Sequence, residues 1–136
     1  MAESLSPEVY SAVLIDHFQH PRNAGAMADA DAEAFVTNPV CGDSLRIFLK
    51  IEDGRVARAS FLSSGCPASI ATSSAATELL AGRDLASAEA LTRDDYADAV
   101  GGLPKAKVHC SVLAASAVHQ AIKGWRARTA AAPPSA

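Results

Sequence analysis

Three cysteines are the residues of this chain best suited to chemistry, because each has small, polar or ionisable neighbours. Each lies in its own short motif: Asn-Pro-Val-Cys-Gly-Asp around Cys41, Gly-Cys-Pro-Ala-Ser around Cys66, and His-Cys-Ser around Cys110. Three thiolates with the His109 imidazole or the Asp43 carboxylate would form a four-ligand set that suits zinc or an iron–sulfur centre. No two cysteines have the Cys-x-x-Cys spacing of a zinc finger, so such a site requires three distant segments to converge.

Two of the thiols are expected at the N-terminal ends of helices. Cys66 precedes a proline, and proline favours the first helical position, so Cys66 is expected at the N-cap or next to it. Cys110 lies three and four residues before Leu113 and Ala114, so its side chain is expected on the core-facing edge of the last helix. A helix N-terminus favours the thiolate, which is the form that binds metal and attacks sulfur. Cys41 is expected in a turn that enters a strand.

Composition and charge restrict the kind of protein. A chain of 136 residues with 49% apolar residues suits one folded domain, and 5% aromatic residues argue against a base-stacking or sugar-binding platform. The net charge of −3, without a run of Lys or Arg, argues against a nucleic-acid partner. The sequence has no apolar stretch of about 18 residues, which argues against a membrane span. Met1 to Pro7 resembles neither a secretory signal nor a transit peptide, so we expect a cytoplasmic location with reduced cysteines.

The apolar pattern predicts one α+β domain in residues 1–128 and a flexible tail at 129–136. Strands are expected at 35–38, 45–51 and 56–62, and an Asp-Gly hairpin turn at 53–54 joins the last two. Helices are expected from Ser6-Pro7 to His20 and over 66–81, 87–91, 92–100 and 109–126. Strands followed by helices predict a three-stranded antiparallel meander sheet with helices packed on one face.

Several side chains have a simpler interpretation than chemistry. His17 lies on the apolar face of the first helix, so we expect it to be packed, and Lys105 is most simply a solvated charge. On the third strand, Ala57, Ala59 and Phe61 are expected to share one face. Four hydroxyl side chains of the helix after Cys66 could form only a polar surface: Ser69, Thr72, Ser73 and Thr77. The cysteines themselves could be small buried hydrophobic residues, since spacing alone does not show that they converge.

Four segments of the chain resemble the IscU/NifU-type iron–sulfur cluster assembly scaffolds, over about Tyr10 to Trp125. They are Ile-Asp-His-Phe at 15–18 leading to Pro-Arg-Asn at 21–23, Asn-Pro-Val-Cys-Gly-Asp at 38–43, Gly-Cys-Pro-Ala-Ser-Ile-Ala at 65–71, and Leu-Pro-Lys-Ala-Lys-Val-His-Cys-Ser-Val-Leu-Ala at 103–114. The segments occur in the family's order with similar gaps, and three cysteine motifs in register are more specific than any one. The histidine before Cys110 resembles IscU and NifU more than the SufU type.

The resemblance implies a scaffold and not an enzyme. Members of the family accept sulfur as a persulfide from a cysteine desulfurase, combine it with iron, hold a transient [2Fe–2S] cluster and release it to carrier or acceptor proteins. Carried over to this chain, Cys41, Cys66 and Cys110 are the cluster thiols, and Cys110 is the persulfide acceptor. Asp43 is the carboxylate associated with iron entry and cluster lability, and His109 is an additional metal ligand. Zinc fits the same ligands when iron is absent.

The resemblance also implies two supporting residues, and it departs from the family at one loop. Tyr10 matches a tyrosine implicated in sulfur reduction or dimerisation, and Lys107, otherwise a solvated charge, is expected to assist. The chaperone-recognition loop of the family commonly reads Leu-Pro-Pro-Val-Lys, whereas residues 103–107 read Leu-Pro-Lys-Ala-Lys. Losing the second proline makes an extended segment less rigid. This departure puts recognition by Hsp70 and J-type chaperones in doubt.

Two other functions compete with the scaffold. A zinc-dependent sulfurtransferase would pass persulfide on without building a cluster. A small interaction module would keep its cysteines buried and inert. The colour of the protein after anaerobic incubation with iron, cysteine and a desulfurase separates the scaffold from the sulfurtransferase.

Overall fold

The computed structural model of the chain describes residues 10–39 and 42–131. Its elements, in chain order, are α1 (Ala12–Gln19), β1 (Ala32–Thr37), β2 (Ser44–Glu52), β3 (Arg55–Ser64), α2 (Pro67–Leu80), α3 (Leu85–Ala90), α4 (Arg93–Ala99), the short 3-10 helix η1 (Lys105–Lys107) and α5 (His109–Ala131). The expected α+β class is confirmed. None of the helices among the described residues is long and apolar enough to cross a membrane.

The three strands form an antiparallel meander in the order β1-β2-β3. Leu45, Ile47 and Leu49 of β2 are each at most 1% exposed, as their alternation with polar residues predicts. The hairpin turn joins β2 and β3 through Asp53 and Gly54, which both have positive φ angles, 54° and 71°. A type I′ turn requires this conformation at both central residues, which explains the Asp-Gly pair.

The face of β3 that packs on the core begins one residue earlier than the alternation predicts. The register shifts between Lys50 and Ile51, so that Ile51 pairs with Val56 and Lys50 pairs with Arg58. The residue between them, Ala57, is only half-buried, whereas Val56 is fully buried. The prediction that Ala57 shares the core face with Ala59 and Phe61 is therefore wrong, because an extra residue in one strand of a bulge reverses the alternation.

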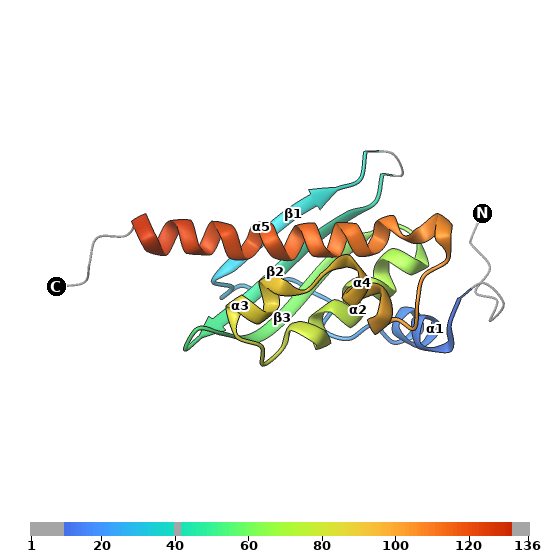
Figure 1. The fold of residues 1–136 in the computed structure, drawn as a ribbon, viewed down its shortest axis with the longest axis horizontal. Helices are drawn as coiled ribbons and strands as arrows, with labels where there is room; N and C mark the ends of the chain where they lie inside the picture. The colour runs from blue at the N-terminus through green and yellow to red at the C-terminus, as the bar shows by residue number, and fades with distance from the viewer. Residues whose placement is uncertain (1–9, 40–41, 132–136) are drawn as a thin grey trace.

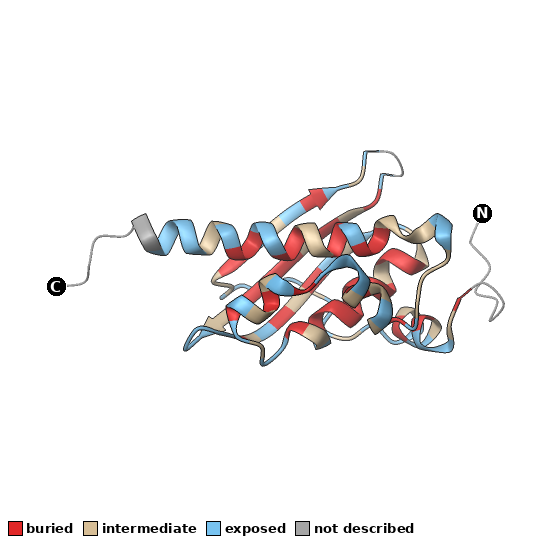
Figure 2. Cartoon of the chain, in the orientation of Figure 1, coloured by how far each residue is buried: buried red, intermediate tan, exposed pale blue. Residues whose placement is uncertain are grey.

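The helices cover one face of the sheet, as expected. Helix α5 contacts β1 and β2, α2 contacts β3, and α1 lies beside α2 (Figure 1). Along α5, buried residues recur between exposed ones, whereas α2 is buried over much of its length (Figure 2). The predicted apolar stripe of α5 is buried along most of its length: Leu113, Ala114, Ala117, Val118, Ala121 and Ile122. The many alanines let these helices pack closely against the strands.

The start of α1 and the end of α5 differ most from the expected helix boundaries, and α3 begins two residues earlier than expected, at Leu85. Helix α1 begins at Ala12, because Tyr10 and Ser11 are not helical and the Ser11 hydroxyl accepts a hydrogen bond from the Leu14 amide at 3.0 Å. The alternative start at Ser6-Pro7 lies outside the described residues. Helix α5 continues to Ala131, so the first three residues of the expected tail at 129–136 are helical. The rest of that expected tail also lies outside the described residues.

The hydroxyl face of α2 is buried and is not a polar surface, which corrects the simpler interpretation. Ser69, Thr72, Ser73 and Thr77 are each at most 2% exposed. The Thr72 and Ser73 hydroxyls donate to carbonyl oxygens one turn earlier, at 2.7 and 2.9 Å. Such back-bonding satisfies a hydroxyl inside an apolar interface.

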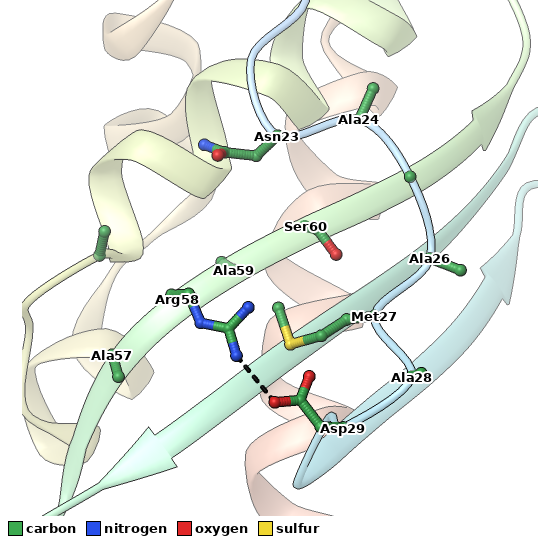
Figure 3. Close-up of a pocket in the computed structure, with 12 residues that line it drawn as sticks. Asn23, Ala24, Ala26, Met27, Ala28, Asp29, Ala57, Arg58, Ala59 and Ser60 are labelled. Atoms are coloured by element: carbon green, nitrogen blue, oxygen red, sulfur yellow. Dashed lines mark hydrogen bonds and ion pairs between the residues drawn. The ribbon is translucent and has the colours of Figure 1, made fainter.

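A segment without regular structure crosses the outer face of the sheet, opposite the helices. The Gly25 amide donates to the Phe61 carbonyl at 2.8 Å, and the Phe61 amide donates to the Asn23 carbonyl at 3.1 Å. Figure 3 shows this segment, residues 23–29, over β3, where it encloses a cavity of about 390 Å³ and where Arg58 pairs with Asp29 at 2.9 Å. The segment therefore shields part of a sheet face that the helices leave uncovered.

Candidate functional site

The cysteine motifs meet at one end of the domain because four element termini lie there. Ser44, at the start of β2, pairs with Ser64, at the end of β3. Asp43 directly precedes the first of these residues, and Cys66 follows the second by two positions. Helix α2 starts directly after Cys66, and α5 starts at His109. The hairpin thus brings two motifs together, and packing of α5 on the sheet brings the third.

Four side chains form what we call the thiol site: Asp43, Cys66, His109 and Cys110. The Oδ2 atom of Asp43 lies 3.4 Å from His109 Nε2 and 3.9 Å from Cys66 Sγ. One ligand atom from each of Asp43, His109 and Cys110 lies within 4.8 Å of the others. Asp43 is 6% exposed and Cys110 is 2% exposed. Cys41, two positions before Asp43 in the sequence, lies outside the described residues.

The His109 ring leaves a buried nitrogen available for a ligand. Its Nε2 atom is shielded from solvent and has no hydrogen-bond partner among the residues that the structure describes. The 3.4 Å approach to Asp43 brings the two groups close without forming a hydrogen bond. Buried polar atoms are nearly always paired, so an unpaired nitrogen beside a carboxylate and a thiol fits a metal-binding role. The donor set of sulfur, nitrogen and oxygen suits iron–sulfur clusters and zinc.

Cys66 and Cys110 differ in exposure and in protonation. Cys66 is half-buried, whereas Cys110 belongs to the core. A hydrogen bond from the Cys110 thiol, helped by the Ser69 amide and the Lys107 charge, lowers the pKa of Cys66 to about 6. The same interaction and burial raise the pKa of Cys110. Of the two thiols, Cys66 is therefore the one that loses its proton more readily.

The N-cap position of Cys66 leaves its sulfur free for chemistry. Cys66 has extended backbone angles, φ −75° and ψ 167°, and its carbonyl accepts from the Ser69 and Ile70 amides. Its sulfur makes no capping hydrogen bond of standard geometry with any described residue, although the Ser69 amide lies near enough to favour the thiolate. A serine or aspartate here would use its oxygen to cap the helix. The sulfur of Cys66 instead faces the thiol site.

The two supporting residues occupy different positions. Tyr10 is 2% exposed and packs in a small cluster with Leu14, Val100 and Cys110. It therefore lies beneath the thiols and not on the outer surface. Lys107, in η1, is near enough for its charge to lower the pKa of both thiols. Lys105 is exposed, as expected.

Two features beside the site are not evident from the sequence patterns. A groove of about 410 Å³ runs from the end of β1 along the start of α5, and His109 is part of its lining. Phe35 and Val112 line the same groove and are 51% and 45% exposed. The second feature is Gly65, whose sequence setting suggests freedom of backbone angle. Its φ angle is not in the positive range, so a left-handed backbone is not the reason for glycine here.

Comparisons with known proteins agree with this geometry. The NifU-like N terminal domain family matches residues 9–132. The chain is 51% identical over 114 residues to an iron–sulfur cluster assembly scaffold protein IscU of Archaeoglobus fulgidus, covering 84% of this chain and 74% of that protein. It is 37% identical over 123 residues to the iron–sulfur cluster assembly scaffold protein IscU of Escherichia coli K12, covering 88% and 95%.

A solved structure supports the fold independently of the sequence. The N-terminal part of a NifU-like protein from Brucella abortus superposes with a TM-score of 0.77 and covers 92% of this chain and 99% of that chain. Its sequence identity is 22%, so the match speaks for the fold alone. The three-stranded meander with helices on one face is thus the architecture of that protein as well.

Proposed function

The chain belongs to the family of NifU-like N-terminal domains, and we propose that it is a scaffold on which iron–sulfur clusters are assembled de novo. The observation that carries the proposal is the thiol site, where two thiols, a carboxylate and an unpaired imidazole nitrogen converge. The relatives at 37% and 51% identity are named as scaffold proteins. A scaffold binds its product transiently and is a carrier, not an enzyme.

Sulfur is proposed to arrive as a persulfide from a cysteine desulfurase. A thiolate of the scaffold attacks the outer sulfur of the donor's persulfide, a new S–S bond forms, and the donor cysteine leaves as a thiolate. The family resemblance favours Cys110 as the acceptor, with Lys107 and Tyr10 assisting. Because Cys110 is 2% exposed, direct transfer requires the segment around η1 to open. Half-exposed Cys66 offers a second route, in which sulfur first joins Cys66 and then passes to Cys110.

The cargo is proposed to be a [2Fe–2S] cluster held by Cys41, Cys66 and Cys110, with Asp43 or His109 as the fourth ligand. The place of Cys41 rests on its motif, two residues before Asp43. Each persulfide sulfur needs two electrons to become sulfide, and each ferrous iron supplies one, so a one-electron carrier must provide the remainder. Zinc is proposed to occupy the same ligands when iron is absent.

The same ligand set explains why the cluster would leave. A carboxylate oxygen is a harder and weaker ligand for a soft iron–sulfur centre than a fourth thiolate. Asp43 lies within 3.9 Å of the Cys66 sulfur, so it can compete for an iron that a thiolate releases. We propose that this competition keeps the cluster transferable to acceptor proteins.

The partners and the location remain predictions. A desulfurase and cluster-accepting proteins follow from the proposed reaction. The altered chaperone loop forms the short η1 turn, and Lys105 and Ala106 are exposed on it. An exposed turn of this kind differs from an extended Leu-Pro-Pro-Val-Lys segment, so we propose handover without Hsp70 and J-type chaperones. A cytoplasmic location without a nucleic-acid or membrane partner is proposed from composition alone.

The deciding experiment is anaerobic incubation with ferrous iron, cysteine and a desulfurase, followed by visible spectroscopy. A red-brown [2Fe–2S] spectrum in the wild-type chain, absent in Cys41→Ser and in Cys66→Ser, supports the scaffold. A colourless protein with tightly bound zinc supports the zinc-dependent sulfurtransferase instead. Slow reaction of every thiol with a thiol reagent in the native state would favour an inert interaction module. Persulfide mapping by mass spectrometry in Cys66→Ser decides whether sulfur reaches Cys110 directly.

A further inference from the structure

Gly65 lies opposite Asp43 at the open end of the β2–β3 hairpin. Ser44 and Ser64 are the last paired residues there, and Asp43 and Gly65 are the next residues beyond this pair. Residues directly opposite each other in an antiparallel pair place their side chains on the same face, with Cβ atoms about 5 Å apart. A side chain at position 65 would therefore point to the face that Asp43 already occupies.

The space that a side chain on Gly65 would need is filled by the Asp43 carboxyl group. A Cβ atom built on Gly65 would lie 2.5 Å from Asp43 Oδ1 and 2.7 Å from its Cγ. Both distances are shorter than a non-bonded contact allows. The two carboxylate oxygens thus face opposite neighbours: Oδ1 lies against the Gly65 backbone, and Oδ2 faces His109 and Cys66. The carboxyl group cannot retreat from an added methyl group without moving relative to the ligands.

The backbone gives no other reason for glycine at this position. Gly42 and Gly54 have φ angles of 78° and 71°, which other residues rarely adopt, whereas the φ angle of Gly65 lies outside the positive range. The φ angle of Gly65 therefore does not itself require glycine. The steric requirement therefore comes from Asp43 alone.

We propose that Gly65 is a positioning residue for the thiol site: because it has no side chain, the Asp43 carboxylate can enter the site and approach His109 and Cys66. The inference deepens the proposed function, on which it rests for its biological meaning. Gly65 itself touches no cargo. It acts through the carboxylate, and a substitution there is expected to reproduce the loss of that carboxylate.

The test is a double-mutant cycle on the metal-free full-length chain, read by cobalt(II) titration. The thiolate-to-cobalt and ligand-field absorption bands report both affinity and ligand set. Gly65→Ala is expected to weaken cobalt binding about tenfold, as loss of an orienting partner does, and to give the bands of Asp43→Ala. In the Asp43→Ala background, Gly65→Ala is expected to change neither affinity nor bands, because the clashing atoms are gone. Wild-type affinity in Gly65→Ala, or effects that add, would overturn the proposal.

Folding supplies a second measurement and a matched control. In α5, a Cβ atom on Gly124 would meet Arg128 Nη1 at an ordinary 3.5 Å, so Gly124→Ala should bind cobalt as the wild type does. If Gly65→Ala fails to fold, rescue by Asp43→Ala supports the steric pairing, and failure in both backgrounds contradicts it. If the wild-type chain never forms a cluster, the proposed function fails, while the cobalt cycle still decides the role of Gly65.

Discussion

Helix α2 borders two groups of polar side chains that differ in whether their polar atoms are paired. Beside the middle of the helix lies what we call the polar seam, which consists of the buried residues His17, Ser74 and Thr77 and the exposed residue Asn23. There the His17 Nδ1 atom lies 2.8 Å from the Ser74 hydroxyl, and Asn23 Nδ2 donates to Thr77 at 3.0 Å. At the N-terminal end of α2 lies the thiol site, where His109 Nε2 is buried and finds no hydrogen-bond partner among the described residues.

The comparison separates polar groups that hold the fold together from polar groups that are available to a ligand. In the polar seam, each side chain ties α1 or the segment after it to α2, so burial of polar atoms is offset by hydrogen bonds. In the thiol site, hydrogen bonds offset the burial of the polar atoms only in part. The possible metal-ligating atoms of these side chains lie close together. Residue type does not distinguish His17 from His109, and burial does so only by degree, since their side chains are 8% and 28% exposed. What distinguishes them is the partner.

The sharpest test of this comparison is Cys66→Ser, for which we expect the largest effect. Cluster formation should be lost, because a neutral hydroxyl replaces the thiolate ligand. Fold stability should change by less than about 1 kcal/mol, because a serine N-cap stabilises a helix and opposes the loss of the thiolate contacts. Iron–sulfur absorbance and denaturant unfolding measure the two quantities. A cluster yield equal to the wild type would remove Cys66 from the ligand set.

Ser74→Ala should have the next largest effect, and it should lower fold stability while leaving cluster formation unchanged. The Ser74 hydroxyl serves both His17 and the Arg22 amide, each at 2.8 Å. Its removal leaves two buried groups unpaired, which costs about 2 kcal/mol of unfolding free energy. Cluster yield per folded molecule should not change. A lower cluster yield per folded molecule in Ser74→Ala would show that the polar seam and the thiol site are not independent.

The neighbouring serine is a matched control for Ser74→Ala. Ser73 is equally buried in the same helix, but its hydroxyl donates only to the Ser69 carbonyl of its own helix, at 2.9 Å. Such a back-bond does not hold two elements together, so Ser73→Ala should cost less than about 1 kcal/mol. Equal losses in the two variants would mean that serine volume, and not the link to α1, matters.

The fold was predicted correctly where the sequence signals are local. The prediction failed where the interacting residues are far apart in the sequence. The Asp53-Gly54 turn is a short-range pattern and appears as expected, and the helix expected over 92–100 begins directly after its N-cap Thr92. The predicted start of α1 was wrong, because Ser11 is held by a distant partner: its hydroxyl donates to the Val100 carbonyl. The predicted core face of β3 was wrong, because the bulge that changes it depends on how β3 pairs with β2. No local pattern reports either interaction.

The thiol site shows the same division. The N-cap setting of Cys66 and the core-facing position of Cys110 follow from neighbouring residues, and the structure has both. Convergence with Asp43 was implied by family resemblance only, since it depends on the hairpin register and on α5 packing. The buried hydroxyls of α2 were open to a surface interpretation, because the segments that cover them are distant in the sequence: Asn23, which donates to Thr77, lies 54 positions away.

Asp43→Ala tests the lability argument and should have a moderate effect. Without the competing oxygen, a cluster held by the thiolates should decay several-fold more slowly during transfer to an apo-ferredoxin or to a chelator. The decay of the visible absorbance measures the lifetime. A lifetime equal to or shorter than that of the wild type would show that the carboxylate holds the cluster and does not release it.

The smallest expected effect concerns pH and returns to the polar seam. Burial, and then the Arg22 charge, lower the pKa of His17, while Glu78 and Asp16 oppose them. The Arg22 amide already donates to the Ser74 hydroxyl, so that hydroxyl is free to donate to His17 Nδ1, which assigns the neutral ring its proton at Nε2. The folded chain therefore favours neutral His17.

The sign of the pH dependence follows from this preference. As the pH falls, an unfolded histidine takes up a proton near pH 6.5, which is a higher pH than His17 in the folded chain requires. Lower pH therefore stabilises the unfolded state relative to the folded state. The stabilisation from neutral His17 is complete above pH 6.5 and is lost as the pH falls toward the lower pKa of the folded state. The measurement is denaturant unfolding at about pH 7.5 and 5.5 in the Cys66→Ser background, which removes the other shifted group in this window. His17→Gln should lose less stability over that interval than its parent does. A parallel loss in both would mean that the seam does not hold His17 neutral, and the contrast with the thiol site would then rest on hydrogen bonds alone.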